Sequence, residues 1–316
     1  MEIPMTIITY VDAHKELKEN INKSSLKTDK ITFAGVGKRD VYNITAPFLS
    51  AGKTVIAGRV ENRDDEHSEL VFFEEIGNQW LPIENAQTLQ LQDPFFTKIN
   101  NELILGGVEI ATAPNEPEGT LTWRTIFYKE KDIYRLEKFF QGPEHMKDIR
   151  LVELNNKRIG IFTRPQGEKG GRGKIGYNEV DCLEDLSETV IDEAKLFNQF
   201  LPDEWGGANE VHLLKNGKLG VLAHIARFSQ QETYRHYASS AFVYDPATSE
   251  YSQMKMIACR DLFGKGAAKR PDLEDVVFSG GLKRDGNGKA VLYAGIGDAE
   301  AHWLEIDDPF AEWEAS

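Results

Sequence analysis

The feature of this 316-residue chain that most restricts its fold is one segment pattern that occurs five times. In each copy a polar residue leads an apolar strand, a tight polar turn follows, and a second strand ends in small residues. The copies read NITAPFLSAGKTVIAGRVE (43–61), DPFFTKINNELILGGVE (93–109), DIRLVELNNKRIGIFTRP (148–165), NEVHLLKNGKLGVLAHIA (209–226) and DVVFSGGLKRDGNGKAVLYAGIG (275–297). Self-similarity at such a period is the sequence signature of a repeat architecture.

The residues that lead the copies are Asn43, Asp93, Asp148, Asn209 and Asp275, which are 50, 55, 61 and 66 residues apart. Steps of this size suit four-stranded blades whose outer strands vary in length. The turns contain Asn and Gly, which tolerate the positive φ of tight hairpins. We therefore predict an all-β fold, a five-bladed β-propeller formed by residues 1–316 as a single domain. A double-sheet sandwich, the competing all-β fold, does not explain five copies.

Composition narrows the partners and the compartment. A net charge of −14 repels phosphate backbones, so we expect no nucleic-acid partner. No stretch reaches the roughly 18 to 20 apolar residues of a membrane span, and the N-terminus does not read as a secretory signal. Cys182 and Cys259 lie far apart without metal-ligand spacing, which favours a reducing compartment. We predict a cytoplasmic protein with a carbohydrate substrate and neither metal nor cofactor; strand edges in the N-terminal segment leave a homodimer open.

The leading residues also indicate where the chemistry lies. The first strand of each blade lines the central channel of a propeller, so the residue that opens it lies at the channel mouth. Collecting carboxylates there costs free energy unless a ligand, a cation or shared protons relieve their repulsion. Each acid taken singly is equally well explained as a turn cap or a partner for backbone amides. The five together favour a functional site.

The same segments resemble the superfamily of five-bladed propeller enzymes that process glycosides, which includes furanosidases, arabinan-degrading enzymes and mannoside phosphorylases. The resemblance spans roughly residues 31–310. Asn43 with Pro47 resembles the first-blade Asn-Pro region of the mannoside phosphorylases, and Gly58-Arg59-Val60-Glu61 resembles their sugar-contacting Arg motif. Gln92-Asp93-Pro94 resembles their Glu-Asp-Pro-Arg motif, in which the Asp handles proton transfer.

Two further segments are similar to furanosidase motifs, and three positions depart from the family patterns. Asp148-Ile149-Arg150 looks like the Arg-Asp-Pro segment of the furanosidases, and Asn209-Glu210 looks like the site of their general acid. Phe95 and Gln92 stand where the phosphorylase motif has Arg and Glu, which favours hydrolysis over phosphorolysis. Asn43 stands where furanosidases have Asp, so the chain is placed in a branch of its own.

Most glycosidases need one protonated and one ionised carboxyl group. We predict Asp93, Asp148 and Glu210 as the catalytic residues. Glu210 is expected to donate the proton and Asp93 to act as base or nucleophile, while Asp148 holds sugar hydroxyls and tunes the pKa of the donor. The residues predicted to bind substrate are Asn43, Arg59, Glu61, Glu109, Arg150, Arg164, Trp205, Asn209 and Asp275.

The supporting side chains have competing interpretations. Arg59, Arg150 and Arg164 can donate paired hydrogen bonds to a sugar or simply neutralise the acids. Trp205 is the better stacking platform, whereas Trp123 reads as a core residue. A buried core role is the preferred interpretation of His224. The glycine-rich basic loop at 167–176 reads as a mobile loop beside the active face that can also hold an anion.

We therefore predict a glycoside hydrolase that acts on a small glycoside or oligosaccharide at the channel mouth. The first alternative is a mannoside-type phosphorylase, which requires Arg59, Arg150 or the glycine-rich loop to form an anion site beside the acids. The second is a non-catalytic sugar-binding or regulatory propeller. A hydrolase needs two carboxyl groups about 5 to 9.5 Å apart around one pocket, whereas a binding module does not.

Overall fold

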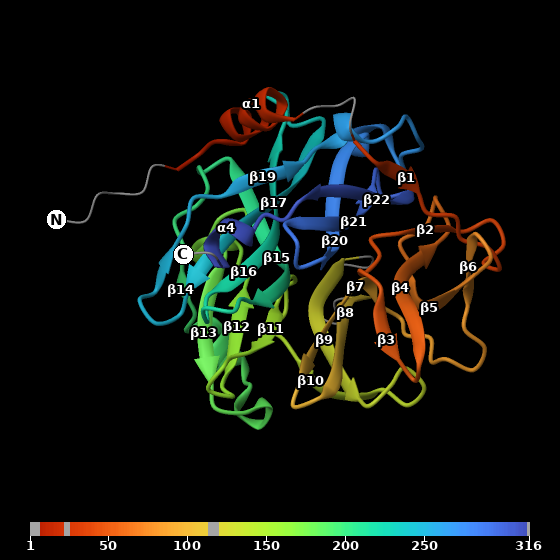
Figure 1. Cartoon of the computed structure of the whole chain (residues 1–316), viewed down its shortest axis with the longest axis horizontal. Coiled ribbons are helices and arrows are strands. Elements are labelled where there is room, and N and C mark those ends of the chain that lie inside the picture. Colours follow the sequence, from red (N-terminus) through yellow and green to blue (C-terminus); the bar gives the residue numbers. More distant parts are fainter. Residues whose placement is uncertain (1–6, 22–25, 113–119, 315–316) are drawn as a thin grey trace.

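The computed structural model describes residues 7–21, 26–112 and 120–314. They form β-sheets that follow one another in sequence order around a common centre (Figure 1). The first sheet contains β2 (Asp40–Tyr42), β3 (Phe48–Ser50), β4 (Lys53–Glu61), β5 (Glu69–Ile76) and β6 (Gln79–Pro82). The second contains β7 (Gln92–Ile99), β8 (Glu102–Thr112), β9 (Leu121–Glu130) and β10 (Glu137–Gln141). The third contains β11 (Arg150–Glu153), β12 (Ile159–Thr163), β13 (Gly176–Val180) and β14 (Lys195–Leu196).

The last two repeats share one nine-stranded sheet. One part holds β15 (Glu204–Leu213), β16 (Leu219–Phe228), β17 (Arg235–Asp245), β18 (Glu250–Tyr251) and β19 (Lys255–Ala258). The other part holds β20 (Asp275–Arg284), β21 (Lys289–Ile296), β22 (Glu300–Asp307) and β1 (Thr28–Lys30). Two parallel residue pairs between β17 and β20 join the parts. The all-β prediction is thus confirmed, and hydrogen bonding divides the strands into four sheets.

The first strand of the chain completes the last sheet. β1 pairs antiparallel with β22, with Asp29 opposite Trp303. The segment just before the first repeat is thereby held beside the segment just after the fifth. This pairing closes the ring of sheets, as Figure 1 shows at its upper right.

The predicted hairpins form at the inner strands of the sheets. Their turns use positive φ at Ala51, Asn100 and Asn101, and Gly217. In the third hairpin the positive φ falls on Lys157 and not on the two asparagines before it. The Asn and Gly residues in the sequence therefore predicted the positions of these hairpins correctly, but in the third hairpin they did not identify the residue with positive φ.

Apolar side chains seal each sheet against its neighbour. The rings of Phe48 and Phe96 stack at 4.3 Å between the first and second sheets. Phe95 packs with Ile149 and Ile161 in a buried cluster between the second and third sheets. Burying one such side chain contributes about 1.5 to 3 kcal/mol. These contacts hold each sheet in place relative to its neighbour. They therefore also determine where the inner ends of the strands lie around the centre.

Helices are few and peripheral. Helix α1 (Tyr10–Asn20) is capped by Thr9, whose hydroxyl accepts from the amide of Asp12 at 3.0 Å. The short helices are α2 (Gly167–Gly170), η2 (Leu183–Asp185), α3 (Glu188–Asp192), η3 (Arg260–Leu262), η4 (Pro271–Leu273) and α4 (Ala311–Glu314). Within the described ranges, no helix has the length and apolar character needed to traverse a bilayer.

Candidate active site

The polar residues that lead the first three repeats share an unusual backbone conformation. Asn43, Asp93 and Asp148 have φ of 45°, 48° and 61°. Asn and Asp tolerate this left-handed region better than most side chains, and such residues concentrate at functional sites. In the second repeat the bend includes a β-bulge, because the β7–β8 register shifts at this point. The recurring polar residue therefore marks a bend at the start of the inner strand.

The fourth and fifth repeats have a β-bulge within longer strands, without the positive φ of the first three repeats. The register of β15 shifts at Asn209, and that of β20 shifts at Gly280. The bulge of the fifth repeat thus lies at Gly280, five residues beyond Asp275, which leads this repeat in the sequence. A strand that continues past its bulge leaves no break in the apolar pattern, so the sequence does not show where the bulge lies.

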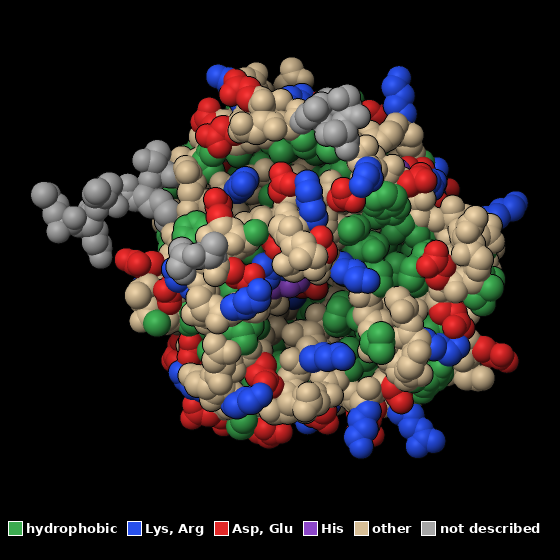
Figure 2. Space-filling model, in the orientation of Figure 1, with side chains coloured by type: hydrophobic (Ala, Val, Ile, Leu, Met, Phe, Trp, Pro, Cys, Tyr) green, Lys and Arg blue, Asp and Glu red, His purple; other side chains and the backbone are tan. Residues whose placement is uncertain are grey.

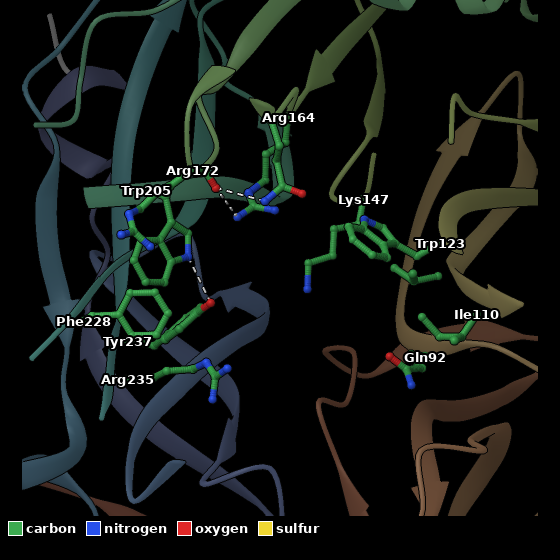
Figure 3. Close-up of a pocket in the computed structure, with 12 residues that line it drawn as sticks. Gln92, Ile110, Trp123, Lys147, Arg164, Arg172, Trp205, Phe228, Arg235 and Tyr237 are labelled. Atoms are coloured by element: carbon green, nitrogen blue, oxygen red, sulfur yellow. Dashed lines mark hydrogen bonds between the residues drawn. The ribbon is translucent and has the colours of Figure 1, made fainter. Parts of the chain in front are cut away.

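A cavity of two adjoining chambers lies where the bends meet. The inner chamber, of about 210 Å³, is rich in charged side chains, among them Asp93, Asp148, Asp298, Arg59 and Lys269. The outer chamber, of about 400 Å³, has an apolar wall that includes Val108, Ile110, Trp123, Trp205 and Phe228. Five residues line both chambers, and we call them the collar: Gln92, Lys147, Arg164, Arg235 and Tyr237. Figure 2 shows Lys and Arg side chains around a hollow near the middle of this face, and Figure 3 shows the outer chamber.

Asp93 is a buried carboxylate held from one side. Its Oδ1 accepts from Asn43 Nδ2 at 2.7 Å and from Arg59 Nη1 at 3.2 Å. Burial opposes its ionisation, but the charges of Arg59 and Lys147 outweigh burial and hold the pKa of Asp93 below its usual value. Asp93 is therefore ionised at neutral pH. Three predicted site residues, Asn43, Arg59 and Asp93, meet here.

Asp148 is a second buried carboxylate with an unsatisfied oxygen. Arg164 Nε lies 3.5 Å from its Oδ2, beyond good hydrogen-bond contact, and Oδ2 has no hydrogen-bond partner among the described residues. Burial opposes its ionisation, yet the charges of Arg164 and Lys147 hold the pKa of Asp148 below its usual value. A buried acceptor without a donor is costly. This oxygen is therefore available to a ligand hydroxyl.

Asp298 is a third carboxyl group that the sequence analysis missed. It lies in the turn between β21 and β22, with φ of 51°. Burial raises the pKa of Asp298 despite the nearby Arg59, and the charge of Asp93 adds to the increase. Two carboxyl groups in one chamber are thus shifted in opposite directions, which is how a site keeps one ionised and one protonated. The only sequence signal was the Gly297-Asp298 step after the fifth repeat.

The collar presents cationic donors to the cavity. Lys147 forms no ion pair with the described part of the chain, and its side chain extends into the space between the walls in Figure 3. Arg164 donates through Nε to the carbonyl of Gly206 at 2.9 Å, while its buried Nη1 has no partner among the described residues. Arg235, by contrast, pairs with Asp272. Lys147 directly precedes Asp148 in the sequence, and that adjacency was the signal that could have revealed it.

His224 is buried, as predicted, but it lines the inner chamber and is not confined to the core. Its Nδ1 lies 2.8 Å from Asn209 Oδ1. Burial lowers the pKa of His224 to about 3, so the ring is neutral at neutral pH. His224 therefore offers a ligand a neutral ring nitrogen.

Glu210 lies outside both chambers. Its Oε2 accepts from the backbone amide of Leu282 at 2.6 Å and lies 3.0 Å from His212 Nε2. The carboxylate thus ties β15 to β20 next to the bulge. Because the Glu210 carboxylate does not line the cavity, it is not placed to donate a proton to a substrate bound there. The placement therefore does not support the predicted acid role.

Five other predicted binding residues do not line the chambers either. Asn209 lies beneath His224, and Asp275 pairs with His236 Nδ1 at 2.5 Å. Glu109 lies on the flank, 3.8 Å from Arg124. The remaining two, Arg150 and Glu61, contact residues that lie next to the chambers or line them.

Arg150 and Glu61 act through their neighbours. Arg150 donates to the carbonyl of Asn209 at 2.6 Å, and its guanidinium lies 3.8 Å from the ring centroid of Phe95. Phe95, which replaces the Arg of the phosphorylase motif, is therefore a packing partner beneath the site. Glu61 accepts from Arg59 Nη2 at 2.8 Å and also binds Lys269, so it positions two cations of the inner chamber.

The remaining predicted residues reach the cavity. Trp205 lines the outer chamber, where its Nε1 donates to the Tyr237 hydroxyl at 3.0 Å. Trp123, interpreted from sequence as a core residue, lies on the opposite wall (Figure 3). The glycine-rich loop lies beside the cavity as predicted, and it contributes Arg172 to the outer chamber.

Family comparison gives this arrangement its context. Residues 17–312 match a family that is described as a protein of unknown function, DUF1861. The chain belongs to the DUF1861 family. No curated protein sequence matches it.

The DUF1861 chain is also similar to solved structures over nearly its whole length. MPT-1, a GDP-Man-dependent mannosyltransferase from Leishmania mexicana, is 33% identical with a TM-score of 0.85, and the match covers 96% of this chain and 95% of that one. MPT-4, a mannose phosphorylase from the same organism in complex with a phosphate ion, is 33% identical with a TM-score of 0.83, covering 94% and 93%. A β-1,2-mannobiose phosphorylase from Listeria innocua shares the fold at 13% identity and a TM-score of 0.61, covering 91% and 92%.

These similarities confirm the resemblance drawn from the sequence. The structural neighbours of this DUF1861 chain are carbohydrate-active enzymes, among them mannoside phosphorylases and a β-fructofuranosidase. The chain is a member of the propeller glycosidase and phosphorylase superfamily.

Proposed function

We propose that this DUF1861 protein is a mannoside-type glycoside phosphorylase, which transfers a sugar between phosphate and the hydroxyl of an acceptor. This proposal replaces hydrolysis, the preferred interpretation of the sequence, with its first alternative. One observation carries it: Lys147 and the unpartnered Nη1 of Arg164 lie at the junction of the chambers, beside the carboxyl groups.

The collar favours phosphate over water as the nucleophile. The buried Nη1 of Arg164 is a donor without a hydrogen-bond partner among the described residues, and charge-assisted hydrogen bonds to a phosphate oxygen satisfy both this donor and Lys147. Hydrolysis requires a carboxylate base beside a water molecule and does not need these two donors. The similar mannose phosphorylase MPT-4, whose structure is a complex with a phosphate ion, supports the same assignment.

The chemistry balances with the residues present. In phosphorolysis an oxygen of HPO₄²⁻ bonds to the anomeric carbon, and the bond from that carbon to the leaving oxygen breaks. The leaving oxygen keeps the electron pair and receives the proton that HPO₄²⁻ loses. We assign the relay of this proton to the ionised Asp93, whose described contacts both use Oδ1 and leave Oδ2 to accept the proton from phosphate and pass it to the leaving oxygen.

In the synthetic direction the ionised Asp93 accepts the proton of the acceptor hydroxyl, which its lowered pKa permits at neutral pH. Asp298, whose pKa burial raises, is the carboxyl group that we assign to hydrogen-bond a sugar hydroxyl. Asp148 accepts from a second hydroxyl through its unpaired Oδ2. The inner chamber thus binds the sugar that is transferred.

We further propose that the nine-stranded sheet consists of two blades, which gives a five-bladed single domain. Each of its two parts carries one sequence repeat and one β-bulge in the first strand of that repeat, and only two residue pairs link the parts. The cytoplasmic location stays a prediction from sequence.

The test is sugar release from short mannosides with and without inorganic phosphate. We expect release to require phosphate, and Lys147→Gln to raise the KM for phosphate about tenfold or more, as the loss of a charged hydrogen bond predicts. Lys138→Gln, an exposed lysine on β10, is the matched control and should behave as wild type. Release that is equally fast without phosphate would show a hydrolase instead.

A further inference from the structure

The lining of the outer chamber is cationic, and the acids that pair with its cations lie outside that lining. Four cations line it: Lys147, Arg164, Arg172 and Arg235. Among the described residues no Asp or Glu lines it, although the chain carries a net charge of −14. An acidic protein repels anions at long range, so a site that binds them needs a local cluster of this kind.

Arg172 is fixed on the chamber wall by its backbone. Its carbonyl accepts from Gln166 Nε2 at 3.0 Å and from Arg164 Nη2 at 3.4 Å. The guanidinium lies 5.0 Å from the ring centroid of Phe228 and 5.9 Å from that of Trp205. Contacts of this kind hold an arginine in place while its remaining N–H groups stay free.

The described anionic partner of Arg172 is a surface residue. Arg172 Nη2 lies 2.6 Å from Glu232 Oε1, and the Glu232 side chain is 65% exposed. Exposed ion pairs contribute at most about 1 kcal/mol. A ligand anion inside the chamber can therefore compete with Glu232 for this guanidinium.

One phosphate ion does not account for all four cations. A phosphate at the collar meets Lys147 and Arg164, whereas the third cation of the collar, Arg235, pairs with Asp272. Arg172 lines only the outer chamber, and both it and Arg235 lie over Phe228, at 5.0 and 5.6 Å from its centroid. Figure 3 shows these two arginines with Trp205 and Phe228 on one wall, facing Trp123 and Ile110 across the space.

We propose that the outer chamber is a second anion subsite, which binds a phosphoryl group carried by a ring-bearing ligand. Arg172 and Arg235 bind the phosphoryl group, and the ring lies against the apolar wall. A chamber of about 400 Å³ has room for both. A phosphorylated sugar and a nucleotide share this chemistry. The inference rests on the proposed function only in taking the inner chamber as the site of the transferred sugar.

Two variants that break the same ion pair separate ligand binding from structural support. Arg172→Gln removes the cation, whereas Glu232→Gln removes its competitor and frees the cation. We expect Arg172→Gln to weaken binding of the phosphorylated ligand about tenfold, the usual loss of one charge-assisted hydrogen bond, and Glu232→Gln to leave it unchanged or a few-fold tighter. Arg172→Lys should restore part of the affinity.

Calorimetric titration of the full chain supplies the measurement, with mannose 6-phosphate, GDP, mannose and guanosine as probes and thermal unfolding as the check on folding. The phosphorylated member of at least one pair should bind more tightly than its neutral counterpart, and the tighter of the two identifies the source of the phosphoryl group. Equal affinity within both pairs, or loss of affinity in both Arg172→Gln and Glu232→Gln, would overturn the proposal.

Titration with inorganic phosphate alone keeps the two hypotheses apart. Phosphate binding that depends on Lys147 but not on Arg172 supports the collar and tests the proposed function. If it is present while the phosphorylated probes show no dependence on Arg172, the second subsite is wrong and the phosphorylase proposal stands.

Discussion

The second and fourth repeats have the same sequence pattern and serve different ends. Asp93 lies at the start of β7 and lines the inner chamber, whereas Asn209 lies within β15 and its side chain supports His224. The difference is strand length, since β15 begins five residues before its bulge at Asn209. Trp205, near the start of β15, therefore lines the outer chamber, whereas Asn209 and Glu210 line neither chamber.

The comparison shows that a repeat fixes backbone geometry more firmly than it fixes function. Both repeats have a β-bulge at this place, but the polar side chain reaches the inner chamber only in the second repeat, where the strand starts at the bulge. The missing carboxyl group comes from a turn outside the repeat, at Asp298. The residue at which an inner strand begins therefore decides which side chain of that repeat lines the cavity.

Asp93→Asn is the change with the largest expected effect, because it removes the proton-transfer group of the second repeat and retains its shape. We expect kcat to fall about 10³-fold, within the range for loss of general acid–base catalysis. Initial rates in both reaction directions measure it. A variant that retains most of its activity would remove Asp93 from the chemistry and with it the contrast between the repeats.

Asp298→Asn tests whether the second carboxyl group comes from the turn after β21. The folded protein raises the pKa of Asp298, so it binds this proton more tightly than the unfolded chain does, and stability falls as pH rises above the unfolded value near 3.9. The amide removes that loss. We expect Tm to rise by roughly 2 °C or more at pH 7 and the gain to vanish below about pH 4, while sugar affinity weakens.

Thermal unfolding of Asp298→Asn at several pH values provides the check, with Asp285→Asn as control. Asp285 is exposed, in the turn before β21. A gain in Tm that does not depend on pH would contradict a raised pKa of Asp298 in the folded protein.

Glu210→Gln has the smallest expected effect on activity and tests the other side of the comparison. Its oxygen still accepts from the Leu282 amide, so kcat should stay within about threefold of wild type, while stability falls by about 0.5 to 1.5 kcal/mol. Steady-state rates and urea unfolding measure the two quantities. A fall in kcat comparable to that of Asp93→Asn would restore the acid role predicted from the sequence.

The parts of the site that follow local patterns were predictable from the sequence. The all-β fold, the hairpins and the meeting of Asn43, Arg59, Asp93, Asp148 and Arg164 follow from one repeat and one resemblance. Each of these residues lies at or near an end of an inner strand, where the repeat itself determines the position. Trp205 was found for a similar reason, because it stands beside glycines just before a repeat.

The rest depends on information that lies outside the repeats. Asp298 and Lys147 are in turns whose direction is set by tertiary packing, and Tyr237 is on the third strand of its sheet. Glu210 was expected at the channel mouth but does not line either chamber, because a bulge of one residue reverses the side to which a side chain points. A strand pattern alone does not show such a bulge.

The pairing of β1 with β22 has a consequence for how the chain reaches its native state. Residues near position 29 bind residues near position 303, so the ring cannot close until almost the whole chain has been synthesised. Contacts of such long sequence separation make folding slow, and they leave the edge of β22 unpaired in the meantime. The pairing of β1 with β22 therefore closes the ring, and the cavity can assume its final shape only after these two strands have paired.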